Sequence, residues 1–287
     1  MNGTLTGVAA ALAASALYGV AVGLQALEAR RVPPRHSLQV SLLTRLARRP
    51  LWLLGAATGL LGWALQAFAL SVAPVTLVAP TLATSLVFLL LIGAFLFREP
   101  VGWGDAVGLL AVAFGVAGLG LLAPARSETH SMANGTILLL ALLAAVVIAP
   151  LALRGSRRAP NQIVAVGAGV AYGLVALTTK FADDDLRSAH LSALVLWLCA
   201  TGVIATLGVL NEMSALQRRP VTQVAPVVFG LNVMVPVLLA PILAGESWKL
   251  PGVERSALLA SLIAVIAGII SLSRSNTVVA VLAPHQP

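Results

Sequence analysis

The residues of greatest chemical interest lie at equivalent places in a repeated pattern. Residues 74–80 read PVTLVAP and residues 220–226 read PVTQVAP, so six of seven positions agree at an offset of 146. The same offset pairs Gln66 with Glu212, and both stand inside apolar stretches. Because ionisable groups in such surroundings are costly and usually functional, Glu212 is expected to bind a proton or a metal cation.

A second interpretation of Glu212 stays open. The residue lies near the end of its apolar stretch, where it could pair with Arg218 or Arg219 instead of facing a cavity. Its equivalent, Gln66, is neutral, so the two copies differ in charge at this position.

The repeated segments also predict interrupted helices. Proline removes a backbone donor, so Pro80 and Pro226 are expected to free carbonyl groups inside their helices. Thr76 and Thr222 could satisfy these carbonyls, or they could line a substrate cavity together with the broken backbone. Other polar residues expected at such a cavity are Tyr18, Tyr172, Asn211, Gln223 and Asn232.

Patterns typical of enzymes and metal centres are not found in the sequence. The single cysteine, Cys199, lies in an apolar run and is expected to be a small core residue. No glycine-rich phosphate loop follows a strand. The histidines all stand in predicted loops or in the tail: His36, His130, His190 and His285. The chain is therefore predicted not to be an enzyme and to use no cofactor.

Composition predicts that these polar residues sit in membrane helices. Hydrophobic residues make up 59% and charged residues 10% of the 287 residues, against roughly 25% charged in soluble proteins. A helix needs about 20 apolar residues to span a bilayer. Such stretches occupy about 5–28, 51–71, 75–97, 102–122, 134–153, 162–181, 191–213, 221–244 and 256–273. The expected fold class is an all-α integral membrane protein of about nine transmembrane helices.

The basic residues predict an orientation. With the N-terminus outside, 13 Lys and Arg fall in cytoplasmic segments and 5 in exterior ones, and basic residues favour the cytoplasmic side. The formal charge of +8 is spread in short clusters beside apolar runs, which argues against a nucleic-acid partner. The expected location is a cell membrane, with a cytoplasmic C-terminus; the alanine-rich, arginine-over-lysine composition suggests a bacterial inner membrane.

The repeat predicts two halves of opposite orientation. Residues 16–20 resemble residues 171–175, so the first four helices correspond to the last four. An odd number of crossings between equivalent helices inverts the second half, as in many secondary transporters, whose sites lie between the repeats. The predicted units are 1–123 (first repeat), 134–153 (linker helix), 160–275 (second, inverted repeat) and 276–287 (cytoplasmic tail).

Two segments outside the apolar stretches carry charge. Residues 29–50 are basic and include Pro33 and Pro34, which block a continuous helix. This segment is expected either to lie flat on the inner membrane surface or to be a solvated loop. Residues 183–185, all aspartate, are expected to form a solvated acidic turn.

Pairs of glycines four residues apart predict close helix packing. They are Gly19 with Gly23, Gly55 with Gly59, Gly104 with Gly108, and Gly169 with Gly173. Such pairs form small stripes that let helix backbones approach each other.

From Trp52 through residues 73–80 to residues 97–99 and the glycine-rich stretch ending near Leu122, the sequence resembles the drug/metabolite transporter (EamA-like) superfamily. Within it, the NIPA-type magnesium transporters are the most similar, including the nine-helix layout and the basic stretch after the first helix. The resemblance implies a secondary transporter that works by alternating access and moves magnesium or another divalent cation.

One difference from that family concerns the substrate. The NIPA-type proteins carry an acidic residue in the second helix, three positions before an Asn, and this sequence has Trp63 and Gln66 there. Hard divalent cations prefer several oxygen ligands. The alternatives are therefore a proton-coupled transporter of a small organic metabolite, or a membrane scaffold that transports nothing. The expected partners are the lipid bilayer and a small-molecule or divalent-cation substrate, and a homodimer is compatible with the sequence.

Overall fold

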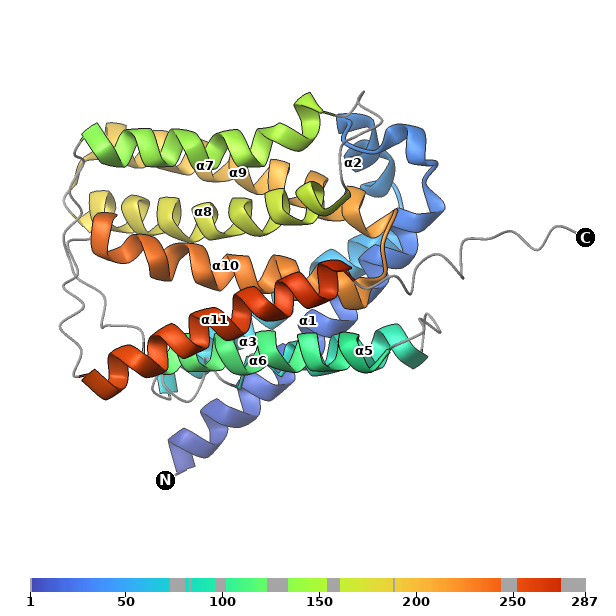
Figure 1. Cartoon of the computed structure of the whole chain (residues 1–287). Helices are drawn as coiled ribbons and strands as arrows, with labels where there is room; N and C mark the ends of the chain where they lie inside the picture. The colour runs from blue at the N-terminus through green and yellow to red at the C-terminus, as the bar shows by residue number, and fades with distance from the viewer. Residues whose placement is uncertain are drawn as a thin grey trace, which may run out of the picture.

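The computed structural model describes residues 2–72, 81–82, 84–95, 102–122, 134–153, 161–187, 189–243 and 252–274. Within these residues the secondary structure is helical and no strand occurs, which confirms the all-α prediction (Figure 1). The helices are α1 (Asn2–Arg31), η1 (Pro34–His36), α2 (Val40–Leu46), α3 (Pro50–Val72), α5 (Ser85–Phe95), α6 (Trp103–Leu122), α7 (Asn134–Ala152), α8 (Asn161–Arg187), α9 (Leu191–Leu216), α10 (Val221–Leu243) and α11 (Gly252–Arg274).

Two of the described helices are long and apolar enough to cross a bilayer. They are Leu5–Arg31, with 27 residues, and Leu191–Leu216, with 26 residues, against a requirement of about 20. The first half of α9 exposes its apolar side chains, with Leu191 at 68%, Leu196 at 65% and Val203 at 61%. Cys199 lies on this stretch and is exposed, so its prediction as a core residue was wrong.

Contacts in the first half of the chain fix the directions of its helices. The α1 residues Tyr18 and Ala21 contact Gly62 and Gly59 of α3 in reverse order, so α1 and α3 are antiparallel. Gly19 and Gly23 lie against Phe88 and Ile92 of α5 in the same order, so α1 and α5 are parallel. The end at which α1 finishes is called the α2 end below, since α2 lies there (Figure 1).

The second half has the same pattern of neighbours. Gly208 of α9 contacts Tyr172 of α8, and Thr201 of α9 hydrogen-bonds Thr178 of α8, which makes these helices antiparallel. Gly169 and Gly173 contact α10 at Leu231 and Val235 in the same order, so α8 and α10 are parallel.

The outer helices α6 and α11 run side by side in opposite directions (Figure 1). Gly268 of α11 lies against Gly108 and Val112 of α6, whereas Ser261 of α11 lies against Gly115 and Gly118. The α6 helix runs away from the α2 end, so α11 begins at the opposite end of the molecule and runs back (Figure 1).

The predicted glycine packing is present with one exception. A Cβ at Gly19 would lie 2.9 Å from Phe88 Cβ, and one at Gly173 would lie 2.7 Å from Val235 Cβ. Such distances leave no room for a side chain, so these glycines set the helix spacing. A Cβ at Gly104 would meet nothing within 4 Å, so close packing does not require a glycine there, although the Gly104 carbonyl accepts a hydrogen bond of 3.3 Å from the Ser271 hydroxyl of α11.

The connection between α1 and α3 packs on protein and is not a solvated loop. Leu38, Leu42 and Leu46 are buried and belong to the main hydrophobic core. The hydroxyl of Ser214 in α9 accepts a hydrogen bond of 2.9 Å from the Leu38 amide, and the Gln217 amide donates to the Val32 carbonyl at 3.0 Å. This connection therefore joins the first half of the chain to the end of α9.

An acidic residue of α8 and one of α1 are buried. Residues 183–185 continue α8 instead of forming an acidic turn, and Asp185 is buried. Glu28, at the end of α1, is also buried, and its carboxylate lies 2.5 Å from Arg31 Nη1 and 2.7 Å from Arg49 Nη1.

Several predictions fall outside the described residues. These concern the first copy of the repeated heptapeptide, with Thr76 and Pro80, and the tail at 276–287.

Candidate functional site

In the first half of the chain, the hydroxyl of a tyrosine is hydrogen-bonded to Gln66, the residue that the repeat pairs with Glu212. Tyr18 of α1 donates a hydrogen bond of 2.8 Å to Oε1 of Gln66 in α3. Gly62 stands one helical turn before Gln66, and a Cβ there would lie 3.3 Å from Cδ1 and Cε1 of Tyr18. Because Gly62 has no side chain, the Tyr18 ring can pack directly against the backbone of α3.

The second half contains the same arrangement with a carboxylate. Tyr172 of α8 donates a hydrogen bond of 2.6 Å to Oε2 of Glu212 in α9. Gly208 stands one turn before Glu212, and a Cβ there would lie 3.2 Å from Cε1 of Tyr172. Glu212 is 8% exposed. The hydrogen-bond partner of the Glu212 carboxylate is thus the neutral phenol of Tyr172 on the neighbouring helix α8.

The two sites use three comparable residues and differ in the type of one of them. Each has a tyrosine on the first helix, a glycine on the second, and a polar side chain four residues after the glycine. The sequence offset predicts that Gly62 and Gly208 are equivalent, but it gives no sign that both support tyrosines. Glu212 in place of Gln66 is the difference that matters chemically, because only the carboxyl group can gain and lose a proton.

Asn211 stands next to Glu212 but its side chain reaches a different helix. It is fully buried, and its Nδ2 donates to the Val147 carbonyl of α7 at 3.0 Å. Its Oδ1 has no hydrogen-bond partner among the described residues. Asn211 therefore links α9 to α7 and leaves one buried acceptor unused.

The residues predicted on α10 occupy its first half. Thr222 and Gln223 are buried, and Oε1 of Gln223 has no hydrogen-bond partner among the described residues. Pro226 is also buried, whereas Asn232 is partly exposed. An unpaired buried amide oxygen is uncommon, and this one is available to accept a hydrogen bond from water or a bound solute.

A serine that the sequence did not single out satisfies backbone carbonyls before α5. Ser15 is fully buried in α1, and its Oγ lies 2.9 Å from the Ala11 carbonyl and 3.0 Å from that of Thr81. Thr81 precedes α5, whose first residue is Ser85. A small polar residue in an apolar helix gives little signal, because a hydroxyl also bonds to its own helix four residues back.

The described residues contain no group of three or more His, Cys, Asp or Glu arranged to hold a metal ion. Glu212, predicted as a metal ligand, is in this part of the chain accompanied by amide and hydroxyl groups. A divalent cation here would depend on neutral oxygens and water for most of its ligands.

Comparison with known proteins finds one relative over nearly the whole chain. It is an uncharacterized protein of Corynebacterium glutamicum, 26% identical over 289 aligned positions that cover 96% of this chain and 98% of the relative. No family model matches the sequence. No solved structure matches it.

Proposed function

We propose that this protein is a secondary membrane transporter of the drug/metabolite type, with its site between two inverted repeats. The observation that carries the proposal is the matched pair of Tyr18 with Gln66 and Tyr172 with Glu212. Two polar pairs, each formed with a tyrosine of the neighbouring helix and a glycine one turn before the polar residue, are what a duplicated binding half would retain.

The helix directions support the inversion. The α1 helix, which carries Tyr18, runs toward the α2 end. The α9 helix finishes at that end, beside Leu38. Because α8 is antiparallel to α9, α8 starts at the α2 end, and Tyr172 therefore lies on a helix that runs away from it. The α3 and α9 helices are likewise opposed. Equivalent helices of opposite direction are the arrangement of inverted-topology transporters.

The surface supports a bilayer location. Large apolar side chains are exposed on several helices, among them Phe114 at 73% and Ile263 at 65%. Exposed apolar surface of this extent marks contact with lipid or another protein. Together with two helices of spanning length, it favours a multi-pass protein of the cell membrane, oriented with its N-terminus outside as the basic residues predict.

Glu212 is the group through which we expect transport to be coupled. When ionised, its carboxylate accepts the Tyr172 hydroxyl hydrogen; when protonated, it becomes a donor for a substrate or a neighbouring acceptor. Among the described residues, Glu212 makes no ion pair, and the free energy of charging a buried carboxyl depends on whether the cavity is open to water on one side or the other. This dependence is what links proton binding to alternating access.

The geometry favours an organic solute coupled to protons over a divalent cation. The described residues offer one carboxylate in α9, Glu212, and two amide oxygens that have no hydrogen-bond partner among them, Asn211 Oδ1 in α9 and Gln223 Oε1 in α10. Amide oxygens accept hydrogen bonds from the amino or hydroxyl groups of a small polar molecule. Because amide oxygens also ligate hard cations, they keep magnesium as the second candidate, in line with the family resemblance.

The test is transport by the purified protein in proteoliposomes that contain a pH-sensitive dye. A panel of amino acids, amines and sugars is added outside under an imposed pH gradient, and magnesium is measured separately with a magnesium-sensitive dye. We expect at least one organic solute to drive proton movement. Glu212→Gln should abolish this movement, and the matched variant Gln66→Ala should retain it.

Each other result has a clear meaning. Magnesium entry that depends on Glu212, without proton movement, would replace the leading proposal with the second candidate. A protein that moves no solute, while Glu212→Gln and Gln66→Ala leave the cellular phenotypes of a deletion strain fully complemented, would contradict transport and favour a membrane scaffold.

A further inference from the structure

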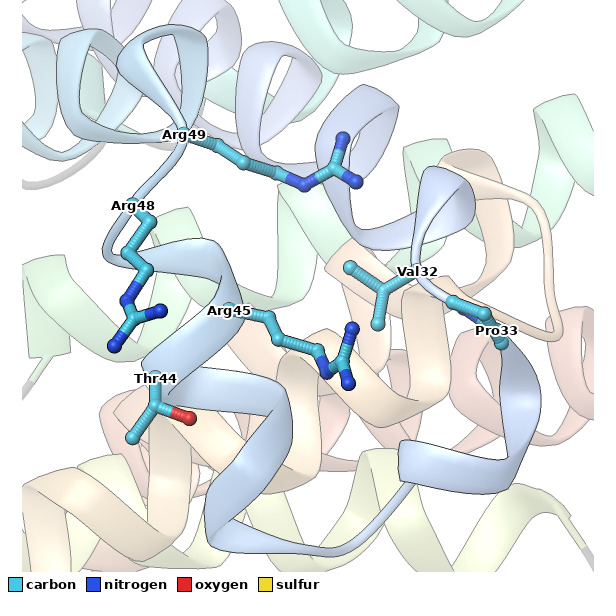
Figure 2. Close-up of a pocket in the computed structure, with 6 residues that line it drawn as sticks. All are labelled: Val32, Pro33, Thr44, Arg45, Arg48 and Arg49. Carbon is cyan, nitrogen blue, oxygen red and sulfur yellow. The ribbon is translucent and has the colours of Figure 1, made fainter.

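A pocket of about 490 Å³ lies at the α2 end of the molecule, between the end of α1 and the segment that leads into α3. It is lined by Val32, Pro33, Thr44, Arg45, Arg48 and Arg49. Figure 2 shows Arg45 and Arg49 extending toward Val32, while Arg48 turns to the side of Thr44. Three guanidinium groups thus surround one opening.

The positive charge in this pocket is only partly compensated. Arg49 is paired with Glu28, which also pairs with Arg31. Arg45 and Arg48 are exposed, and their guanidinium groups make no hydrogen bond or ion pair with the residues that the structure describes. The Glu28 carboxylate is therefore shared between two of the four guanidinium groups at this end of α1 and the start of α3, those of Arg31 and Arg49, and the other two belong to Arg45 and Arg48.

The pKa of the neighbouring His36 is lowered by desolvation and by the positive charge of this region. Desolvation and the charges of Arg45 and Arg35 lower the pKa of His36 below its ordinary value. His36 lies in η1, directly before the loop that leads to α2. An anion bound beside Arg45 would offset that charge, so the His36 pKa would rise on binding.

The pocket is built on fixed elements. Its Val32 edge is held because the Val32 carbonyl accepts the Gln217 amide at 3.0 Å. Its Arg45 side belongs to α2, whose Leu42 and Leu46 are fully buried. The Thr44 hydroxyl donates to the Ser41 carbonyl at 3.1 Å. The arginines are therefore the groups available for recognition.

We propose that this arginine pocket binds a phosphate group, carried either by an anionic lipid headgroup or by a soluble phosphate ester. Planar guanidinium groups match phosphate oxygens in bidentate geometry, which makes arginine the usual residue for such sites. The apolar Val32 and Pro33 edge suits the glycerol or acyl portion of a phosphate ester. This site is separate from Glu212, so it does not depend on the proposed transport function.

The experiment compares two double variants of the full-length protein. Arg45→Gln with Arg48→Gln removes the unpaired pocket arginines, and Arg35→Gln with Arg255→Gln removes the same charge from exposed positions outside the pocket. Native mass spectrometry measures retained phosphatidylglycerol against phosphatidylcholine. Equilibrium binding of labelled glycerol 3-phosphate measures the soluble source. Thermal melting in phosphatidylcholine nanodiscs checks that each variant is folded.

We expect the pocket variant to bind phosphatidylglycerol or glycerol 3-phosphate roughly 30-fold more weakly, at about fivefold per basic residue, with the control changed less than twofold. If glycerol 3-phosphate does not displace bound phosphatidylglycerol, the pocket is a lipid site. Binding of glycerol 3-phosphate in detergent identifies a soluble-ester site. Equal losses in both variants would mean diffuse charge attraction and would overturn the proposal, as would the absence of anion binding to the unmodified protein.

A second measurement remains informative if the pocket variant does not fold. Nuclear magnetic resonance titration of His36 in the unmodified protein, with and without the bound anion, should give a higher pKa in its presence. An unchanged His36 pKa at saturating anion would place the anion elsewhere and contradict the pocket.

Discussion

At the scale of single residues, one substitution separates two otherwise matched sites. Gln66 and Glu212 each accept a hydrogen bond from a tyrosine hydroxyl, and each stands one helical turn after a glycine. Only Glu212 has a side chain that can gain and lose a proton. The sequence offset was sufficient to predict their equivalence. It could not predict the tyrosine partners, because each tyrosine is distant in the chain and its ring orientation depends on the space left by Gly62 or Gly208.

Removing the two tyrosine hydroxyls should have unequal effects on stability. Tyr172→Phe takes a donor from a buried carboxylate, and hydrogen bonds to charged groups contribute about 1.5–3 kcal/mol. Tyr18→Phe takes a donor from a neutral amide, for which about 0.5–1.5 kcal/mol is usual. Denaturation of the purified protein in detergent near neutral pH measures both. Equal losses in the two variants would indicate that Glu212 is not ionised there.

At the scale of helices, apolar length predicted the elements well, but packing faces were not predictable. The ends of α3, α6, α7 and α10 lie within a residue or two of the predicted stretches. Gly104 and Gly108 formed one predicted stripe. Gly108 lies against Gly268 of α11, whereas the Cβ position of Gly104 faces open space and only its carbonyl reaches α11, at Ser271. In a helix that is apolar on all sides, the sequence carries no periodicity that marks which face meets protein.

Two glycines on α6 allow a matched test of its packing. A Cβ at Gly115 would lie 2.6 Å from the Ser261 carbonyl oxygen of α11, whereas one at Gly104 would meet nothing within 4 Å. Gly115→Ala should therefore destabilise the protein by about 1–3 kcal/mol, since α6 and α11 must separate. Gly104→Ala should be neutral or stabilise by up to about 1 kcal/mol. Thermal melting compares them, and equal effects would contradict the α6–α11 contact.

At the scale of the whole molecule, the two halves meet along α6 and α11 and again at the α2 end. Hydrogen bonds from Leu38 to Ser214, from Gln217 to Val32 and from Arg30 to the Leu216 carbonyl join the α1–α3 connection to the end of α9. The predicted orientation places this end at the cytoplasm, with α11 starting on the outside. Under this prediction, the basic residues of the connection face the cytoplasm together with the end of α9.

Cysteine labelling in intact cells tests this orientation. With a membrane-impermeant maleimide, Arg255→Cys should be labelled and Arg48→Cys should be labelled only after the cells are opened. The unmodified protein carries only Cys199, which is exposed on the apolar half of α9. Cys199 should resist the impermeant reagent in both conditions because lipid covers it. The reverse pattern for the two variants would invert the topology, and ready labelling of Cys199 would contradict a membrane position for α9.

The sequence by itself determined where the apolar helices lie, predicted two related halves, and marked Gln66 and Glu212 as the positions to compare. These are local or periodic properties, because helix formation follows apolar length and duplication leaves a constant offset. Only the tertiary structure decided what those positions contact: Tyr172 for Glu212, α7 for Asn211, and α9 for the basic connection that holds Leu38. Such partners depend on the spacing and direction of helices far apart in the chain, and that spacing is set by close contacts such as those at Gly173 and Gly208.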